Sequence, residues 1–208
     1  GFLVLQGFAD PAACDGLSRR ALEIVEGFDP AEAGVFSTTQ GDAGRDEYFK
    51  TSGDKIRCFL EQEALDAHGD LAAPKSGAVN KIGHAMHDLD AVFEGFSHGA
   101  KLANLALSIG LSQARILQSM FIFKPPRIGG EVSWHQDGAY LRTEPESVTG
   151  FWFGLDEATI ENGCMQAIPG GHLGPLRRRF RRHGDDLVLD VLDDVAHHGA
   201  IEAVRKNG

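Results

Sequence analysis

The sequence is short of cysteine. Its three cysteines, Cys14, Cys58 and Cys164, are odd in number, lie far apart and form no CxxC pair. A disulfide framework is therefore a poor fit, and isolated thiols of this kind are typical of a reducing compartment. On this basis we expect a cytoplasmic protein.

Long apolar runs and an excess of positive charge are also absent. No segment reaches the roughly 18 consecutive apolar residues that a membrane helix needs, and no signal peptide is recognisable. The formal net charge of -10 repels phosphate backbones and anionic lipid surfaces. We therefore expect a small-molecule substrate as the partner, with no nucleic acid and no membrane.

The composition is that of a globular protein with a buried core. The chain has 208 residues, of which 42% are hydrophobic and 24% charged. Such values predict a single domain over residues 1–208. The chain starts at Gly1 without an initiator methionine and ends in "VRKNG" without a recognisable terminal element, so we expect it to be a fragment.

The first half of the chain, about residues 1–112, reads as mainly helical. After a predicted strand, "GFLVL", Asp10 and Pro11 supply an N-cap and a first helical residue, and apolar residues then recur at helical spacing up to Gly27. The stretch "TSGDKIRCFLE" predicts a turn and a short strand. Residues 88–110 predict two helices, with core positions that include Val92, Phe93, Ala106 and Ile109, and Gly110 as the C-terminal stop.

The second half, about residues 113–208, reads as mainly β. "ARILQSMFIFKPP" alternates strictly and predicts a strand with Met120 on a mixed face. "VTGFWFGLDEATIENGCMQAIPGGH" predicts two more strands with a turn at Asn162–Gly163. Helices followed by short strands suggest a barrel or jelly roll with helices packed outside, an α+β fold that is mainly β in its core.

The stretch "GGEVSWHQDGAY" holds the candidate metal ligands. Residues two apart in an extended segment share a face, so His135 and Asp137 can converge on one ion while Gln136 turns away. The alternative is a satisfied polar pair at a strand end. Two further His-x-Asp motifs, at residues 68–70 and 183–185, have glycine in the middle and polar surroundings, which predict surface turns.

The donor types narrow the choice of metal. One imidazole and one carboxylate offer nitrogen and oxygen without thiolate, which suits Fe(II), Mn(II) or Zn. The leading case is iron held by two His and one carboxylate, because this set leaves coordination positions open for a bidentate co-substrate and dioxygen.

Several blocks, in order along nearly the whole chain, carry a resemblance to a known family. They are "GFLVLQGF", "TSGDKIRCF", "NKIGHAMH", "QSMFIFKPP", "GGEVSWHQD", "TEP" and "ENGCMQAIPGGH". The chain resembles the phytanoyl-CoA dioxygenase family, in particular its domain-containing branch. The resemblance implies an Fe(II)- and 2-oxoglutarate-dependent dioxygenase with a double-stranded β-helix (jelly-roll, cupin-like) core, incomplete at its C-terminus.

The resemblance also implies roles for particular residues. His135 and Asp137 would be two iron ligands, and their presence favours hydroxylation over halogenation, since related halogenases carry a small residue at the carboxylate position. Four residues at matching motif positions would line the pocket of the 2-oxoglutarate co-substrate, with ascorbate as an auxiliary reductant. These four residues are Lys81, Met120, Gln136 and Trp152.

The family pattern breaks near the end of the chain. The family takes a third ligand from a distal histidine and follows it with an arginine, and the nearest matches here are His197 or His198 with Arg205. They lack a preceding core strand. A non-catalytic or inactive binding module on the same scaffold is therefore an alternative, and a cupin-like zinc or manganese hydrolase or isomerase is another.

The substrate is not specified by these motifs. An acyl-CoA or a carboxylic acid would suit the resemblance. The basic run "RRRFRRH", Arg177 to His183, fits an anionic group such as a CoA phosphate, although a run of this kind is more often a solvated face.

Overall fold

The structure is a computed structural model that describes residues 1–36, 47–141, 143–183, 186–191 and 202–203; from residue 178 onward it describes the backbone alone. The chain divides into two compact units, and each is described here by itself. We call residues Pro11–Glu131 the sheet unit. We call Gly1–Asp10 together with Val132–Gly208 the loop unit. Helices and strands together make a mixed α and β protein, as the sequence predicted.

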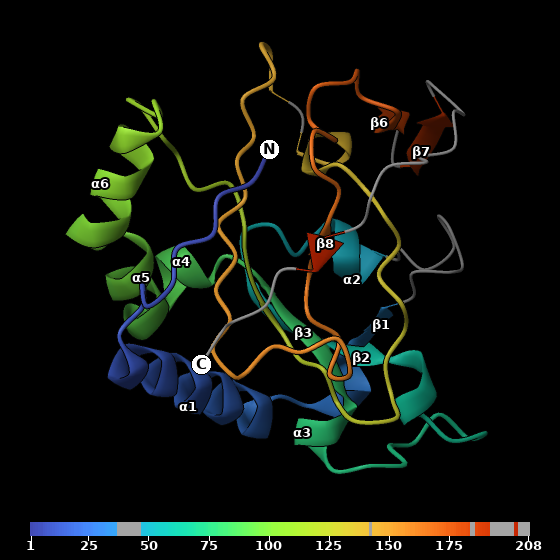
Figure 1. The fold of residues 1–208 in the computed structure, drawn as a ribbon. Coiled ribbons are helices and arrows are strands. Elements are labelled where there is room, and N and C mark those ends of the chain that lie inside the picture. Colours follow the sequence, from blue (N-terminus) through green and yellow to red (C-terminus); the bar gives the residue numbers. More distant parts are fainter. Residues whose placement is uncertain (37–46, 142, 184–185, 192–201, 204–208) are drawn as a thin grey trace. The chain divides into compact units, whose positions relative to one another are not determined.

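A four-stranded sheet forms the centre of the sheet unit (Figure 1). Its order is β1 (Gly34–Phe36), β2 (Ile56–Glu61), β3 (Val79–His84) and β4 (Ser119–Ile122). β1 runs parallel to β2, and the other two pairings are antiparallel. All six residues of β3 are buried, which makes this strand the middle of the core.

The sheet unit contains the helices that the sequence predicted and three short ones, α2 to α4, that it did not. They are α1 (Pro11–Gly27), α2 (Glu47–Lys50), α3 (Lys75–Ala78), α4 (Met86–Leu89), α5 (Ala91–Ser97) and α6 (Ala100–Ser108), with 3-10 turns η1 (Pro30–Glu32) and η3 (Gln62–Ala64). α1 buries one stripe, at Cys14, Leu17, Ala21 and Val25, and contacts α3 and α5. A stripe at this spacing is what the periodicity predicted for residues 11–27.

Residues 88–110 form two helices as expected, but fewer of their apolar residues are buried than the sequence predicted. Phe93 and Ala106 are buried, whereas Val92 and Ile109 are exposed, contrary to the prediction. Gly110 ends the second helix with a φ of 93°, and the N–H of Leu111 bonds to the carbonyl of Ala106. This left-handed residue is the reason that a glycine follows the helix.

Two predicted strands are corrected by the structure. Residues 1–5 are an exposed loop, and in the part of the chain that the structure describes no strand pairs with them. The strand predicted over residues 114–123 is limited to Ser119–Ile122, because β4 pairs only with Lys81–His84 of β3. Alternation alone could not show where the partner strand ends.

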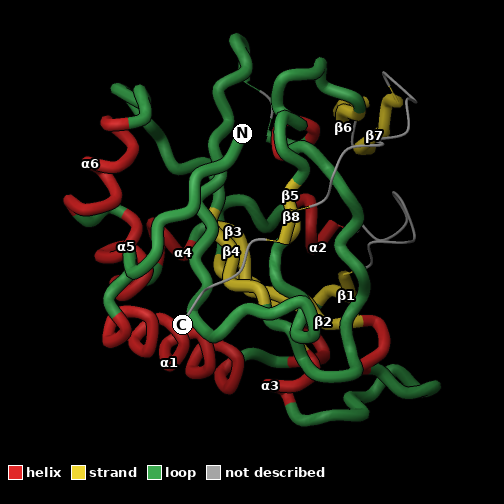
Figure 2. The backbone as a smooth tube through the Cα atoms, viewed as in Figure 1, coloured by secondary structure: helices red, strands yellow, loops and turns green. Residues whose placement is uncertain are grey.

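Loops and turns make up most of the described residues of the loop unit (Figure 2). It contains the 3-10 turn η4 (Asp137–Ala139), the pair β5 (Gln166–Ala167) with β8 (Glu202–Ala203), and the ribbon β6 (Arg178–His183) with β7 (Asp186–Val191). The turn predicted at Asn162–Gly163 is present, with Gly163 at a φ of 80°. Of the two strands predicted around that turn, only β5 is formed, since residues 148–155 have no paired neighbour among the described strands.

A buried carboxylate organises the end of the sheet unit. Glu61, the last residue of β2, accepts a hydrogen bond from the side-chain amide of Asn80 at 2.8 Å and another from the N–H of Gly130 at 3.3 Å. Gly129 has a φ of 122° and approaches Oε1 of Glu61 so closely that a Cβ would lie 3.1 Å from it. Glu61 thus anchors the loop that leads out of this unit.

Of the helices that the structure describes, none has the length and apolar character to cross a membrane.

Candidate functional site

His135 and Asp137 lie where an extended segment passes into the turn η4. Gln136 between them has extended backbone angles, φ -108° and ψ 133°, and Asp137 is the first residue of the turn. The backbone carbonyl of Asp137 accepts hydrogen bonds from the N–H groups of Tyr140 and Leu141, each at 3.0 Å. The turn therefore fixes the backbone from which the Asp137 carboxylate projects.

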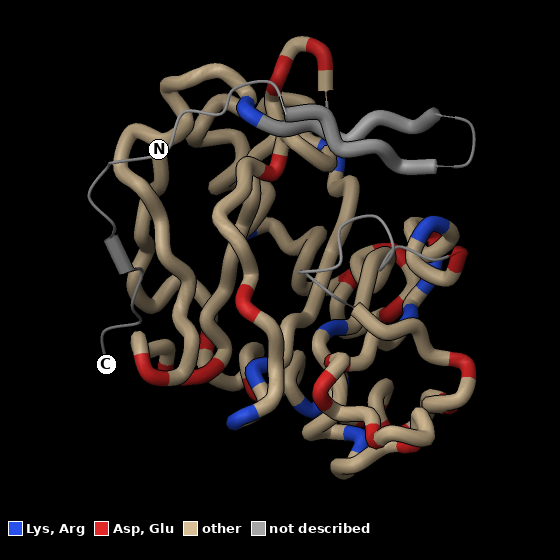
Figure 3. The backbone as a smooth tube through the Cα atoms, turned by 90° about the vertical axis from the view of Figure 1, so that its right-hand side faces the viewer, with Lys and Arg blue, Asp and Glu red and all other residues tan. Residues whose placement is uncertain are grey.

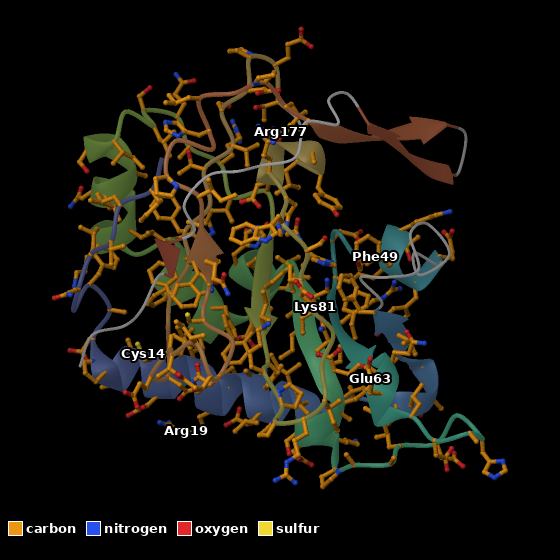
Figure 4. All side chains as sticks on the ribbon, turned by 45° about the vertical axis from the view of Figure 1, so that its right-hand side comes forward. Cys14, Arg19, Phe49, Glu63, Lys81 and Arg177 are labelled. Carbon is orange, nitrogen blue, oxygen red and sulfur yellow. The ribbon has the colours of Figure 1, made fainter. Side chains whose placement is uncertain are left out.

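The two side chains converge, and the residue between them turns away. Nε2 of His135 lies 3.6 Å from Oδ1 of Asp137. The amide of Gln136 instead donates to the carbonyl of Pro175 at 3.3 Å and accepts from the N–H of Arg177 at 2.9 Å. This is the arrangement expected of an extended His-x-Asp segment, and Figure 4 shows Arg177 close to η4.

A backbone carbonyl selects the tautomer of His135. Nδ1 of His135 lies 2.8 Å from the carbonyl oxygen of Ser133, which can only accept a hydrogen bond. Nδ1 therefore carries the proton, and in the neutral imidazole Nε2 holds the lone pair. Hydrogen bonding of one ring nitrogen to a carbonyl is how proteins usually prepare the other nitrogen to bind a metal.

The second carboxylate oxygen of Asp137 lies against Gly150. A Cβ at position 150 would lie 2.8 Å from Oδ2, closer than real Cβ contacts come. The two oxygens of Asp137 therefore have different surroundings: Oδ1 faces the imidazole, and Oδ2 lies in the space that a side chain at position 150 would fill.

The pair is partly exposed, with charged and aromatic side chains near it. The side chains of His135 and Asp137 are 41% and 55% exposed. Acidic side chains occur among the described residues between positions 132 and 176 (Figure 3), but the N–H of Arg177 bonds to Gln136, so charges of both signs lie near the pair. Trp134 and Tyr140 flank the pair and are both exposed, and the Tyr140 ring lies edge-on to His135 with 6.0 Å between ring centroids.

Trp152, a predicted co-substrate residue, also lies in the loop unit. It is exposed, and its ring covers Gly154, where a Cβ would lie 3.2 Å from the six-membered ring.

Lys81 and Met120 lie in the sheet unit, on one face of the sheet. Lys81 pairs with Ile122 and Gly83 pairs with Met120 in the β3–β4 ladder, and directly opposed residues share a face. Lys81 is buried and Met120 is 46% exposed. The structure therefore brings together two of the four residues predicted for the co-substrate.

Aromatic rings surround the ammonium of Lys81 (Figure 4). Nζ lies 3.1 Å from the ring centroid of Phe36 and 5.6 Å from those of Phe49 and Phe59. A cation over aromatic faces is stabilised electrostatically while it is removed from water. Lys81 thus places a buried ammonium beside aromatic rings.

His84 lies next to these aromatic rings, and its surroundings are those of a buried core residue. Its ring contacts those of Phe49 and Phe59, and burial, reinforced by the charge of Lys81, lowers the pKa of His84 to about 4. Ser52 Oγ lies 2.6 Å from the carbonyl of Phe49 and 2.8 Å from Nδ1 of His84. Because the hydroxyl proton goes to the carbonyl, Nδ1 of His84 is the donor to Ser52.

A complete metal-binding set does not form in the part of the chain that the structure describes. Among these residues, no group of three or more His, Cys, Asp or Glu is arranged to hold an ion. The weak candidates for a third ligand, His197 and His198, and the candidate Arg205 lie outside the described residues. His87, another histidine of the sheet unit, is buried, with Nδ1 2.8 Å from Ser119 Oγ.

The other two His-x-Asp motifs differ from the first. Residues 68–70 form an exposed turn, as predicted, in which the Asp66 carboxylate accepts from the N–H groups of His68 and Asp70. In the third copy, His183 ends β6, and Gly184 and Asp185 lie outside the described residues.

Sequence reasoning missed the supporting contacts of the pair. The carbonyl of Ser133 leaves no trace in the sequence, because every residue has a carbonyl. No sequence motif surrounds Gly150. Only the structure shows that the lack of a side chain at this position leaves room for the Asp137 carboxylate. The aromatic residues beside "HQD" were visible in the sequence.

Comparison with known proteins gives consistent matches. Residues 1–203 match the family described as "Phytanoyl-CoA dioxygenase (PhyH)". The chain is 41% identical over 190 residues to "Phytanoyl-CoA dioxygenase" of Arabidopsis thaliana, covering 91% of this chain and 67% of that protein. It is 44% identical over 189 residues to "Phytanoyl-CoA dioxygenase domain-containing protein 1" of Bos taurus, covering 88% of this chain and 65% of the relative.

The protein of the same name from Danio rerio is 45% identical over 192 residues, covering 88% of this chain and 65% of the relative. The chain thus spans about two thirds of the length of the curated relatives that it matches.

Proposed function

Because the chain belongs to the phytanoyl-CoA dioxygenase family, we propose that it is part of an Fe(II)- and 2-oxoglutarate-dependent dioxygenase that hydroxylates a small molecule. The observation that carries this proposal is the pair His135 and Asp137, with Nε2 and Oδ1 3.6 Å apart and Nδ1 hydrogen-bonded to a carbonyl. Family membership supports an oxygenase, and the geometry supports these residues as metal donors.

The donor chemistry fits two ligands of Fe(II). His135 would bind through Nε2 and Asp137 through a carboxylate oxygen, a mixed set that suits iron. Bound iron with 2-oxoglutarate supplies dioxygen activation coupled to decarboxylation of the co-substrate to succinate. The chain's own contribution is to hold the imidazole in one tautomer and to place the carboxylate beside it.

The co-substrate residues remain part of the proposal. Lys81 would offer its ammonium to a carboxylate of 2-oxoglutarate, with Met120 on the same face of the sheet. Trp152 would contribute an exposed ring. Gln136 is the least suited of the four, since both ends of its amide already bond to the backbone at residues 175 and 177.

We also propose the type of core, the number of domains and the location of the protein. A double-stranded β-helix over about residues 113–208, within a single domain and with helices outside it, is what family membership supports. A cytoplasmic location rests on the free cysteines.

An acyl-CoA or a related carboxylic acid is the proposed substrate class. The Arabidopsis relative is named for phytanoyl-CoA, and the basic run Arg177–His183 would meet a phosphate of such a molecule. The run starts at Arg177, whose N–H bonds to the side chain of Gln136, and continues as β6, which contacts η4. This proximity favours a role near the substrate over a remote solvated face.

A non-catalytic binding module is the second candidate. The absence of a three-donor group among the described residues favours it, because two ligands hold iron weakly. The two functions separate by turnover: an oxygenase forms succinate from 2-oxoglutarate in the presence of Fe(II) and dioxygen, whereas a binding module forms none.

The pair itself is tested by two matched variants. We expect His135→Ala to abolish the visible charge-transfer band of the anaerobic Fe(II)–2-oxoglutarate complex and to remove the rise in Tm that Mn(II) gives the wild-type chain. His68→Ala, in an exposed His-x-Asp turn, should change neither. Retention of the Mn(II)-induced Tm shift by His135→Ala would reject His135 as a ligand.

A further inference from the structure

Gln136 lies between the two proposed metal ligands, on the opposite face of the segment. Alternate side chains of an extended segment point to opposite faces. In agreement with this, His135 and Asp137 are exposed, whereas Gln136 is partly buried. A contact made by the Gln136 side chain therefore acts on the segment from behind the pair and leaves the face of the pair open.

The side-chain amide of Gln136 makes two hydrogen bonds of matched polarity. Its nitrogen donates to the carbonyl of Pro175 at 3.3 Å, and its oxygen accepts from the N–H of Arg177 at 2.9 Å. These two backbone groups flank Leu176. A residue in a parallel ladder likewise donates to one residue and accepts from another on either side of its partner. The amide of Gln136 thus bonds to residues 175–177 as a neighbouring strand would.

These two bonds join the segment of the pair to the segment that leads into β6. Among the strands that the structure describes, none includes residues 132–136, so no ladder holds them in place. The turn η4 contacts β6, which shows independently that the two segments lie side by side. Gln136 therefore supplies at this point the hydrogen bonds that strand pairing would otherwise supply.

We infer that Gln136 is a positioning residue, which holds His135 and Asp137 at a fixed spacing by binding the backbone of residues 175–177, and that it does not contact the co-substrate. The inference rests on the proposed function, because it concerns the same metal pair. Donors that are already ordered bind an ion more tightly, since ordering them costs free energy. Both polar ends of the amide are in use, so a co-substrate would have to break one of these bonds.

Three variants separate the parts of this inference. Gln136→Met keeps the length of the side chain and removes the amide. Gln136→Glu keeps an oxygen that can accept from the N–H of Arg177, but an ionised carboxylate cannot donate to the carbonyl of Pro175. Gln166→Met makes the first change at an exposed residue of β5 in the same unit and is the matched control.

Hydrogen exchange of the Arg177 amide, measured by nuclear magnetic resonance, needs no metal. In the wild-type chain we expect this amide to exchange about 2- to 10-fold more slowly than in an unstructured peptide, the factor that corresponds to one hydrogen bond. Gln136→Met should lose this protection, whereas Gln136→Glu and Gln166→Met should keep it. Exchange of the wild-type amide at the rate of an unstructured peptide would overturn the inference without the use of any variant.

Mn(II) affinity, measured by electron paramagnetic resonance without 2-oxoglutarate, tests the effect on the pair. We expect Gln136→Met to bind Mn(II) about 10- to 100-fold more weakly, as loss of a contact that orients a ligand typically does. Gln166→Met should bind like the wild-type chain. Unchanged Mn(II) affinity in Gln136→Met would overturn the inference: accompanied by weaker 2-oxoglutarate binding it would indicate a co-substrate contact, and accompanied by a lower Tm it would indicate a role in stability alone.

The two proposals fail in distinguishable ways. If His135→Ala leaves Mn(II) binding intact, the metal pair itself is wrong. If His135→Ala abolishes binding while Gln136→Met does not affect it, the pair stands and only the role of Gln136 is lost.

Discussion

Two histidines of this chain show how surroundings decide what an imidazole does. His84 is buried between Phe49 and Phe59 and donates Nδ1–H to Ser52. His135 is exposed, donates Nδ1–H to a backbone carbonyl and turns Nε2 toward a carboxylate. The first is kept neutral by burial, and the second directs the lone pair of Nε2 toward the Asp137 carboxylate, where a metal ion would be bound.

The burial of His84 makes stability depend on pH. The pKa of His84 is about 4 in the folded chain, against an ordinary value of 6.5. Below pH 6.5 the unfolded chain binds the proton more readily, so the contribution of His84 to stability is complete above pH 6.5 and is lost as the pH falls toward 4. Within this window the loss approaches about 1.4 kcal/mol per pH unit.

Urea unfolding at pH 7 and at pH 5 measures this effect. We expect the decrease in unfolding free energy between the two pH values to be clearly smaller in His84→Asn than in the wild-type chain. His68→Asn, in an exposed turn, should keep the wild-type decrease. If His84→Asn keeps it too, then His84 is not the group responsible.

At the scale of elements, one aspartate joins two helices. Asp90 is the N-cap of α5 and accepts hydrogen bonds from the N–H groups of Val92 and Phe93. It also forms an ion pair with Arg20 of α1 at 2.7 Å. Burial would raise the pKa of Asp90, but Arg20 and the two N–H donors outweigh burial and hold this pKa below its ordinary value.

Removing the cap should destabilise the sheet unit. We expect Asp90→Ala to lower the unfolding free energy by about 0.5–2 kcal/mol, the usual cost of losing an N-cap. The loss of the ion pair with Arg20 adds to this cost. The contribution should be present above pH 3.8 and disappear as the pH falls further. Asp15→Ala, on the exposed side of α1, is the control for urea unfolding and should stay near wild type.

Local signals explain which elements the sequence predicted well. α1 begins at Pro11 and ends at Gly27, and α6 is followed by Gly110, because caps and 3.6-residue periodicity act within one segment. Strands depend on a distant partner. "GFLVL" and residues 114–118 have the right composition but no neighbour to pair with in the described chain, so alternation predicted strands that did not form.

The contacts of the candidate site likewise fall into two groups: those that local sequence predicts and those that join distant segments. The convergence of His135 and Asp137 follows from two-residue periodicity and was predictable. The contact of Gly150 with Asp137 joins residues thirteen positions apart through a loop, and no local rule predicts it. The aromatic rings around Lys81 likewise come from separate segments of the sheet unit.

At the scale of the whole molecule, the reactivity of the three free, buried thiols can show when each unit unfolds. Cys14 and Cys58 belong to the sheet unit, and Cys164 belongs to the loop unit. Burial also raises the pKa of Cys58 to about 11, so little of the reactive thiolate exists at neutral pH.

Thiol labelling along a urea gradient therefore tests the proposed single domain. We expect little reaction of the folded chain with a thiol reagent, followed by labelling of all three cysteines over one urea range. Mass spectrometry of peptides assigns each label. Labelling of Cys164 at clearly lower urea than Cys14 and Cys58 would mean that the units unfold independently and that the chain is not one cooperative domain.

The contact between His135 and the Ser133 carbonyl has a consequence for genetics. All amino acids, proline included, carry the same oxygen at that point, so saturation mutagenesis of codon 133 would score it as permissive even if the contact were indispensable. Replacing the amide that follows Ser133 with an ester, by chemical ligation, weakens the acceptor while leaving every side chain in place. Essential atoms of the main chain are invisible to methods that vary only side chains.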